Sequence, residues 1–365
     1  MCDTLHDELT QSDRVRPDRR GIVFAVTAAV LFGASTPAAK VLLADISPVM
    51  LAGLLYLGCG VSLGLWLIFR RGDARRQAEA RLARPDLPWL SAVVLFGGIL
   101  GPVLLMWGLD HSPASTSSLL LNLEGVLTAL LAWFVFREHF DRRIALGMGA
   151  IVAGGVLLSW KGTPEIGLPV GSLAVSAACL CWAIDNNLTR KISAADPVQI
   201  TAIKGLVAGS VNVLLALGAG ESLPPLTHAI LAGALGLASY GVSIVLFILA
   251  LRHLGSARTG AYFSAAPFVG AMISIGLLRE PLTIAFAGAA ALMLVGLWLH
   301  VTEKHCHEHD HAYIEHDHWH EHDEHHQHDH PPGIDPEGPH SHPHIHHPLR
   351  HTHAHYPDLH HQHRH

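Results

Sequence analysis

The chain has 365 residues, of which 50% are hydrophobic and only 15% are charged. Soluble domains usually carry about 25% charged residues, so this composition argues against an ordinary soluble protein. The polar residues are concentrated in one place, because residues 302–365 contain 24 of the 30 histidines and 12 of the 30 acidic residues. A low-charge body is therefore joined to a polar tail. The small net charge of the body gives no reason to expect nucleic acid as a partner.

Apolar runs of about 20 residues recur along the body, and each is long enough to cross roughly 30 Å of hydrocarbon as a helix. Lipid offers no partner to unpaired backbone groups, so these runs are expected to be helical. The sequence therefore predicts an all-α polytopic membrane protein with ten transmembrane helices. The expected spans lie near residues 21–43, 47–69, 88–109, 114–136, 143–160, 168–188, 197–218, 226–251, 257–278 and 283–301.

Lys and Arg are unevenly distributed between the expected loops. Four Arg residues lie in the N-terminal segment, residues 1–20, and six more lie between residues 70 and 84, after the second span. Loops on the cytosolic side of a membrane carry such an excess of positive charge. With ten spans, this bias places both termini in the cytosol. The lipid bilayer is then the first expected partner.

The body also repeats itself. The segment Leu109–Leu158 aligns without gaps with Leu251–His300 and keeps the order of a span, an Arg-Glu corner and a second span. The corners contain Glu138 and Glu280, which we expect to form structural ion pairs with the neighbouring Arg residues. The alignment therefore predicts that one half of the body is a copy of the other.

The expected halves are two five-helix repeats, residues 21–160 and residues 168–301. Each repeat has an odd number of spans, so the two repeats have opposite orientations in the membrane. Inverted repeats of this kind build alternating-access transporters, whose substrate site lies between the halves near the bilayer midplane. The sequence shows no phosphate-cradling glycine loop, so ATP-driven transport is not expected.

Two stretches carry a resemblance to a known family. The stretch from Ser115 to Glu138 resembles the fourth helix of the EamA-type branch of the drug/metabolite transporter superfamily, and Ala265 to Glu280 resembles its ninth helix. The resemblance covers residues 21–301 and implies a ten-helix secondary transporter of a bacterial inner membrane, not an enzyme. Members with a long His-rich C-terminus resemble nickel and cobalt efflux proteins, so the resemblance implies these ions as substrates.

The tail, residues 302–365, is rich in metal-ligating side chains. Neutral imidazole suits nickel, cobalt, zinc and copper, and His-rich tracts indicate metal binding. Few large apolar residues are present, so we expect a disordered tail that collects ions without a covalently bound cofactor. A pH sensor, a purification tag or idle low-complexity sequence remain alternatives. The expected metal ligands are His305, His307, His309, His311, His316, His318, His320, His322, His325, His326, His328 and His330.

Polar residues inside the spans are candidates for the transport pathway, because charged groups are costly there and usually face a cavity. Glu124 lies in the middle of the fourth span and is expected to bind an ion, carry a proton, or hold helices together. The other candidates are polar residues within apolar spans, and two of them, Ser117 and Thr128, share a helical face with Glu124. They are Asp185, Lys204, Asn122, Ser117, Thr128 and Cys181.

Two of these candidates leave the substrate open. Cys181 and Asp185 are one helical turn apart, so they are expected to meet one ion unless Asp185 is merely solvated at the cytosolic edge. Lys204 is a counter-charge for Glu124 or for Asp185, or else extends toward the cytosol. A Lys in a cation pathway is awkward, which keeps an anionic or zwitterionic substrate as an alternative.

These features predict a secondary transporter that exports nickel or cobalt in exchange for protons, with the tail as an ion buffer. One alternative is an exporter of an amino acid or another metabolite with a metal-responsive tail. An alternative of another class is a membrane-tethered metal store or sensor. Transition-metal ions and protons are the expected small partners, and a second copy in a homodimer is an open possibility.

Overall fold

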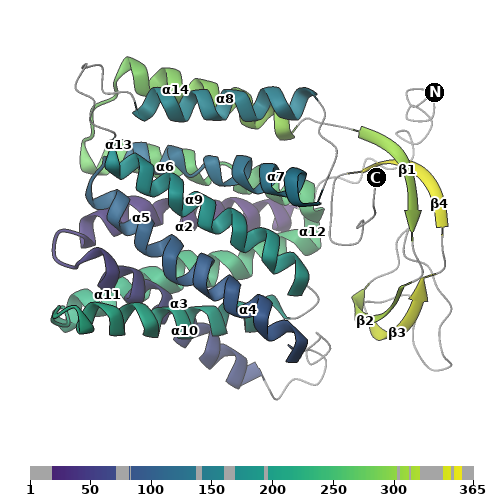
Figure 1. Cartoon of the computed structure of the whole chain (residues 1–365), viewed down its shortest axis with the longest axis horizontal. Helices are drawn as coiled ribbons and strands as arrows, with labels where there is room; N and C mark the ends of the chain where they lie inside the picture. Colours follow the sequence, from purple (N-terminus) through teal and green to yellow (C-terminus); the bar gives the residue numbers. More distant parts are fainter. Residues whose placement is uncertain are drawn as a thin grey trace.

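The computed structural model describes residues 19–70, 82, 84–136, 142–159, 169–192, 196–301, 305–311, 314–320, 340–346 and 349–355. The body is helical throughout the described ranges (Figure 1). Its helices are α2 (Arg19–Leu42), α3 (Pro48–Arg70), η2 (Arg84–Asp86), α4 (Leu87–Val93), η3 (Val94–Leu100), α5 (Gly101–Asp110), α6 (Ala114–Leu120), α7 (Leu123–Phe136), α8 (Arg142–Ser159), α9 (Val170–Thr189), η4 (Arg190–Ile192), α10 (Pro197–Gly218), α11 (Leu226–Gly236), η5 (Leu237–Val242), α12 (Ser243–Phe263), α13 (Ala266–Leu278) and α14 (Ile284–Val301).

Four strands follow in the tail: β1 (His305–His311), β2 (Ile314–His320), β3 (His340–His346) and β4 (Leu349–His355). They form two antiparallel pairs, β1 with β4 and β2 with β3. These segments differ from the expectation of a tail without regular structure. Each strand is paired with its partner along all seven of its residues.

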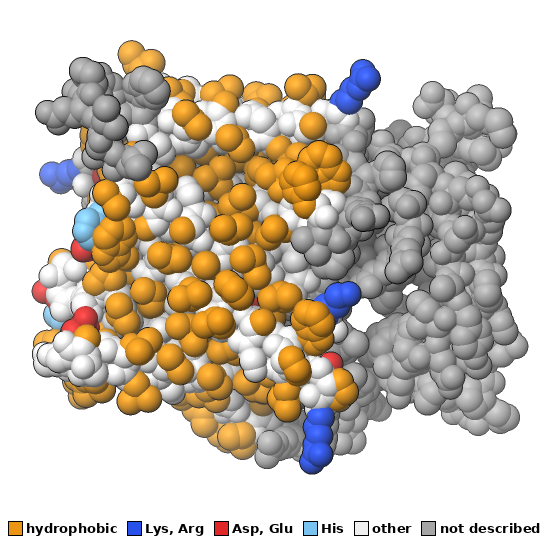
Figure 2. All heavy atoms as spheres, viewed as in Figure 1, with side chains coloured by type: hydrophobic (Ala, Val, Ile, Leu, Met, Phe, Trp, Pro, Cys, Tyr) orange, Lys and Arg blue, Asp and Glu red, His pale blue; other side chains and the backbone are white. Residues whose placement is uncertain are grey.

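A broad apolar band crosses one face of the body. On the face shown in Figure 2, hydrophobic side chains cover the middle, while charged and His side chains lie at the two ends. Within the described residues, 8 helices are long and apolar enough to cross a membrane, and a shorter apolar helix covers Ile284–Leu299. The protein is therefore a multi-pass membrane protein. The ten-span count stays a prediction, since the polar residues of α9 keep this 20-residue helix outside the eight.

The two expected repeats are interleaved and not side by side. The most extensive helix contacts all join the first repeat to the second: α3 packs on α10, α8 on α14, α2 on α12 and α13, and α5 and α7 on α9. Figure 1 shows α8 and α14 as a pair at the upper edge of the body. Movement of one repeat against the other must therefore change contacts throughout the body.

Local irregularities recur at matched positions of the two repeats. The π-helical segment η3 interrupts the third span, and η5 interrupts the equivalent part of the second repeat. The fourth span is broken at Leu121 and Asn122, between α6 and α7, and the matched break at Ser264 and Ala265 separates α12 from α13. Asn122 and Ser264 each donate a side-chain hydrogen bond to the carbonyl three residues earlier, at 2.9 and 2.6 Å. The continuous fourth and ninth spans expected from the sequence are thus each split in two.

One connection differs between the repeats. Pro113 separates α5 from α6, because proline cannot continue a helix without losing a backbone hydrogen bond. The matched residue in the second repeat is Gly255, and α12 runs through it without interruption. The loop expected between the spans 226–251 and 257–278 is therefore helical.

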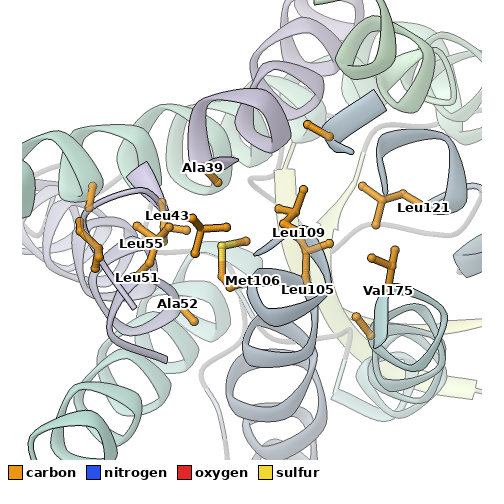
Figure 3. Packing of buried hydrophobic residues seen from close by; sticks show 14 of the residues in the cluster. Ala39, Leu43, Leu51, Ala52, Leu55, Leu105, Met106, Leu109, Leu121 and Val175 are labelled. Atoms are coloured by element: carbon orange, nitrogen blue, oxygen red, sulfur yellow. The ribbon is translucent and has the colours of Figure 1, made fainter. Parts of the chain in front are cut away.

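The largest apolar core lies between helices of both repeats. Figure 3 shows side chains from α3, α5 and α9 meeting there, among them Leu51, Leu55, Met106 and Val175. Each of these four is 3% exposed or less. Small residues let the helices approach closely: a Cβ on Gly60 would lie 2.6 Å from the backbone of Gly205. This close packing fixes the rotation of the helices that carry the polar residues.

Candidate functional site

An ion pair lies inside the helical body. The Lys204 ammonium on α10 donates to the carboxylate of Asp185 on α9, and Thr189 donates to the same carboxylate at 3.3 Å. Their side chains are only 17% and 7% exposed for Lys204 and Asp185. Charges so far from water are costly unless they are paired and hydrogen-bonded. Lys204 therefore pairs with Asp185 and not with Glu124, the other partner that the sequence allowed.

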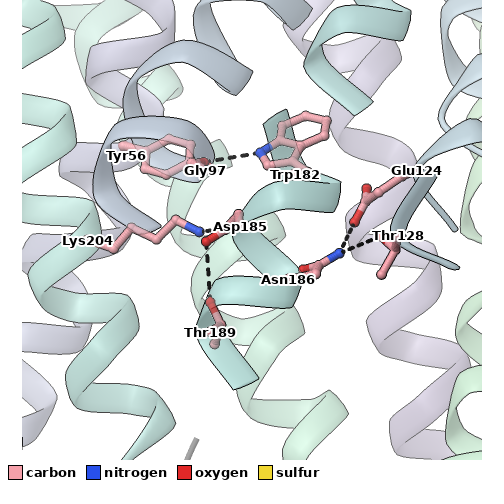
Figure 4. A network of polar contacts seen from close by, with 9 residues as sticks. All are labelled: Tyr56, Gly97, Glu124, Thr128, Trp182, Asp185, Asn186, Thr189 and Lys204. Atoms are coloured by element: carbon pink, nitrogen blue, oxygen red, sulfur yellow. Dashed lines mark hydrogen bonds and ion pairs between the residues drawn. The ribbon is translucent and has the colours of Figure 1, made fainter. Parts of the chain in front are cut away.

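The π-helical segment η3 packs directly against this pair. The carbonyl of Gly97 accepts hydrogen bonds from Tyr56 Oη at 2.8 Å and from Trp182 Nε1 at 3.1 Å (Figure 4). A Cβ on Gly97 would overlap the Asp185 carboxylate and lie 2.5 Å from Lys204 Nζ. Glycine is therefore needed here for the close approach of the backbone to the ion pair. π-Helical turns are frequent at functional sites.

The next carbonyl of η3 is also bonded to a side chain. Asn212, fully buried two turns after Lys204 on α10, donates to the carbonyl of Gly98 at 3.4 Å. Its amide oxygen has no hydrogen-bond partner among the described residues. This contact is a hydrogen bond between α10 of the second repeat and η3 of the first.

Glu124 belongs to a separate polar group on the other side of α9. Asn186 donates to the Glu124 carboxylate at 2.9 Å and to Thr128 Oγ1 at 3.4 Å. Figure 4 shows Asp185 directed toward Lys204 and the adjacent Asn186 directed toward Glu124. Glu124 lies in the first turn of α7, directly after the break in the fourth span. Its carboxylate is bonded to a neutral amide and has no cation in direct contact among the described residues, so a proton or a cation can neutralise it.

The remaining candidates lie outside these two groups. Ser117 is fully buried, and its hydroxyl lies 3.0 Å from Ser112 Oγ. It belongs to α6, whereas Glu124 belongs to α7, so the two do not share the single helical face that the sequence predicts. Asn122 donates within its own turn and to Met293 Sδ at 3.9 Å. Cys181 is buried one turn before Asp185. Among the described residues, no group of three or more His, Cys, Asp or Glu side chains is arranged to hold a metal ion.

Part of the expected metal-binding tail falls within the strands. Strands β1 and β2 contain the first seven of the expected His ligands, from His305 to His320. The other five, His322, His325, His326, His328 and His330, lie outside the described residues. The metal site of the tail stays a prediction.

One expected ion pair is replaced by a different contact. The Glu280 carboxylate accepts hydrogen bonds from the backbone N–H groups of Ala114 at 2.7 Å and Ser115 at 2.8 Å. It therefore caps α6 of the other repeat, where the sequence predicts a pair with Arg279. Free N–H groups at a helix start are stronger partners than an exposed neighbouring side chain. The matched corner at Glu138 lies outside the described residues.

Gly97, Tyr56 and Asn186 contribute to the site although the sequence pattern does not indicate them. Gly97 acts through its backbone carbonyl, which no side-chain pattern reveals, although two adjacent glycines in the middle of an apolar span were a signal. Tyr56 is in a different span, and only tertiary packing brings its hydroxyl to η3. Asn186 follows Asp185 directly, and it faces another helix because consecutive helical residues point in different directions.

A multi-pass helical body, matched irregularities in two halves and buried charges between them define a membrane transporter. The sequence profile of the EamA-like transporter family matches this chain twice, over residues 19–160 and 169–302. The chain therefore belongs to the EamA-like transporter family of the drug/metabolite transporter superfamily. The two matched segments nearly coincide with the two repeats expected from the sequence.

Similar proteins are also transporters. A transporter of Methanothermobacter thermautotrophicus, described as uncharacterized, is 30% identical over 299 residues, covering 76% of this chain and 85% of its own length. The inner membrane transporter YedA of Escherichia coli K12, also described as uncharacterized, is 24% identical and covers 65% of this chain and 76% of its own length.

Two further similarities cover different shares of the chain. A probable 4-amino-4-deoxy-L-arabinose-phosphoundecaprenol flippase subunit, ArnE of Pseudomonas fluorescens, is 37% identical over 107 residues, which is 29% of this chain and 92% of the relative. A solved crystal structure has a TM-score of 0.56 at 20% identity, covering 77% of this chain and 95% of that chain. At this identity, the structural match shows the fold alone.

Proposed function

We propose that this protein is a secondary active exporter of divalent transition-metal ions, with nickel and cobalt as its main substrates and protons as the coupling ion. The observation that carries the exchange step is the Glu124 carboxylate, which lies in the first turn of α7 after the break in the fourth span and accepts a hydrogen bond from the neutral amide of Asn186. A proton or a metal ion neutralises such a carboxylate, so the two compete for it. The metal class rests on the His-rich tail, because imidazole is a good ligand for these ions.

The proposal includes an orientation. Both termini face the cytosol of a bacterial cell, as the distribution of Lys and Arg favours. The tail then binds ions from the cytosol and raises their concentration beside the entrance of the body. Glu124 releases its proton to the cytosol and binds the metal ion there. On the opposite side of the membrane it releases the metal ion and takes up a proton.

Metal content of cells tests the substrate and the residue together. Cells that express the protein should accumulate less radioactive nickel and cobalt than cells without it, and Glu124→Gln should abolish the difference because glutamine neither ionises nor binds a proton. Asp110→Asn is a matched control, since the Asp110 side chain is 44% exposed at a helix end. Unchanged metal content in expressing cells would refute the metal substrate, and full export by Glu124→Gln would remove Glu124 from the mechanism.

Deletion of residues 302–365 separates export from storage. An exporter should keep part of its efflux after the deletion, because the tail raises the local ion concentration but does not move ions across the membrane. A membrane-tethered metal store or sensor should lose its entire effect on cellular metal. The truncated body must be present in the membrane at the level of the full chain for this comparison.

The Asp185–Lys204 pair supports a second candidate function, the export of an amino acid or another organic ion. The ammonium group of a zwitterion is complementary to Asp185, and its carboxylate is complementary to Lys204. The positive charge of Lys204 would repel a metal ion. The related ArnE protein is described as a subunit of a flippase for an amino-sugar lipid, so organic substrates occur among relatives. Counterflow of radiolabelled amino acids in proteoliposomes, with and without nickel, discriminates between the two candidates.

A further inference from the structure

Several side-chain contacts join the two repeats at one end of the body. We call it the distal end, because the chain leaves the opposite end into β1 (Figure 1). At the distal end, Ser47 after α2 donates to the carboxylate of Glu221 after α10. His228 Nε2 on α11 lies 3.7 Å from the carboxylate of Asp45. Each contact pairs a residue of the first repeat with a residue of the second.

Glu280 makes the most specific of these contacts. Its two carboxylate oxygens accept from two consecutive backbone N–H groups, at 2.7 Å from Ala114 and 2.8 Å from Ser115. Hydrogen bonds to an ionised acceptor are stronger than neutral ones, and two parallel bonds also fix direction. Arg279 has a left-handed backbone with φ 54°, which ends α13 and turns the chain at Glu280. A short turn of the second repeat thus caps the N-terminus of α6 in the first repeat.

The helix held in this way leads to the proposed exchange residue. The helix α6 begins at Ala114, and after the break at Leu121 and Asn122 the chain continues into α7 with Glu124 in its first turn. Ser115 is 3% exposed and Ala114 is fully buried, so the hydrogen bonds from Glu280 end within the packed structure. The position of α6 at the distal end therefore depends on a residue of the other repeat.

The two repeats differ at the matched positions. Counted along the repeat alignment, Ala114 and Ser115 correspond to Ser256 and Ala257, which lie inside the continuous helix α12. The backbone N–H groups of these residues are inside a helix and need no cap, whereas those of α6 are free to be capped. The matched stretches differ because Pro113 precedes a new helix in the first repeat, whereas Gly255 lies inside α12 in the second.

We propose that Glu280 is a positioning residue that holds the distal end closed in this state and releases α6 when the protein changes its direction of access. Alternating access opens one end of the body while it closes the other, so a contact that joins the two repeats at one end must break when that end opens. Removal of the contact shifts the population toward the state in which the distal end is open. This inference does not depend on the substrate.

Distance measurements between spin labels test the proposal on the full chain in nanodiscs. Labels at positions 111 and 282 flank the contact, and both native residues, His111 and Leu282, are exposed. We expect Glu280→Ala to shift the distance distribution toward longer separations, so that a minor population of the wild type becomes the main one. Glu280→Gln keeps one accepting oxygen and should give a smaller shift in the same direction.

Arg279→Asn is the matched control, because asparagine tolerates the left-handed backbone and removes only the cation next to Glu280. It should leave the distance distribution unchanged. A wild-type distribution in folded Glu280→Ala overturns the proposal, and so does a shift in Arg279→Asn as large as that in Glu280→Ala. If Glu280→Ala does not fold, the folded Glu280→Gln protein decides, and an unchanged distribution there also overturns the proposal.

Discussion

Replacement of Lys204 by methionine probes the buried ion pair directly. Methionine nearly matches the length of lysine and removes the charge, which leaves the 7% exposed carboxylate of Asp185 with the hydroxyl of Thr189 as its remaining side-chain partner among the described residues. Removing one partner of a buried pair costs about 3–5 kcal/mol, because an uncompensated charge stays buried. Replacing both partners by apolar residues of similar volume is often neutral. Lys204→Met should therefore lower the unfolding free energy by about 3–5 kcal/mol. The double variant Lys204→Met/Asp185→Leu should recover most of this loss.

Denaturant unfolding in lipid–detergent micelles measures the stability part of this prediction, and transport in proteoliposomes measures the function. We expect the double variant to regain stability but not transport, because the pair is kept for its charge and not for its contribution to the fold. A cost below about 1 kcal/mol for Lys204→Met would show that the carboxylate is neutralised without Lys204. Recovery of both stability and transport in the double variant would show that the pair is structural.

Four smaller changes test the packing of the body, two near the ion pair and two on α8. Gly97→Ala should destabilise by about 1–3 kcal/mol in a thermal-unfolding assay, because its Cβ overlaps the Asp185 carboxylate and the ion pair must move. Gly154→Leu should disrupt the pairing of α8 with α14, whereas Gly149→Ala on the same helix meets nothing within 4 Å and should be neutral or slightly stabilising. Tyr56→Phe should cost about 0.5–1.5 kcal/mol at most, since the carbonyl that loses the hydroxyl keeps an indole N–H donor. Equal melting temperatures for the two glycine variants of α8 would contradict the packing argument.

Much of the body could be predicted from the sequence because the bilayer restricts the possible structures. Long apolar runs must be helices, and the alignment of Leu109–Leu158 with Leu251–His300 indicated two similar halves. The same alignment relates the π-helical segments and the helix breaks, although it did not predict them. Pro267 in the first turn of α13 is a sequence signal for the second break, whereas the first break has no helix-breaking residue. At both breaks a polar side chain, Asn122 or Ser264, donates to the carbonyl three residues earlier.

Partner choice at the site could not be predicted for a related reason. Lys204 was expected to pair with either Glu124 or Asp185, and the decision depends on the rotation of α9 about its axis. That rotation is set by close glycine and alanine contacts with neighbouring helices, not by the polar residues themselves. The carbonyl of Gly97 was also hidden, because a backbone group becomes a site only through the irregular turn that exposes it. Glu280 shows the same limit, since its partners are backbone N–H groups far away in the sequence.

The connectivity of the polar contacts assigns different roles to the two carboxylates. Asp185 and Lys204 both belong to the second repeat, so their ion pair moves as one unit when the repeats shift against each other. The hydrogen bond between Asn186 and Glu124 joins the second repeat to the first, so a relative movement of the repeats strains or breaks it. Under the proposed exchange, a ligand or proton that changes the charge of Glu124 would act on this contact between the repeats, which would link its occupancy to the direction of access. Loss of Lys204 alone leaves a buried carboxylate unpaired, so it should affect both stability and transport, whereas Glu124→Gln should affect mainly transport.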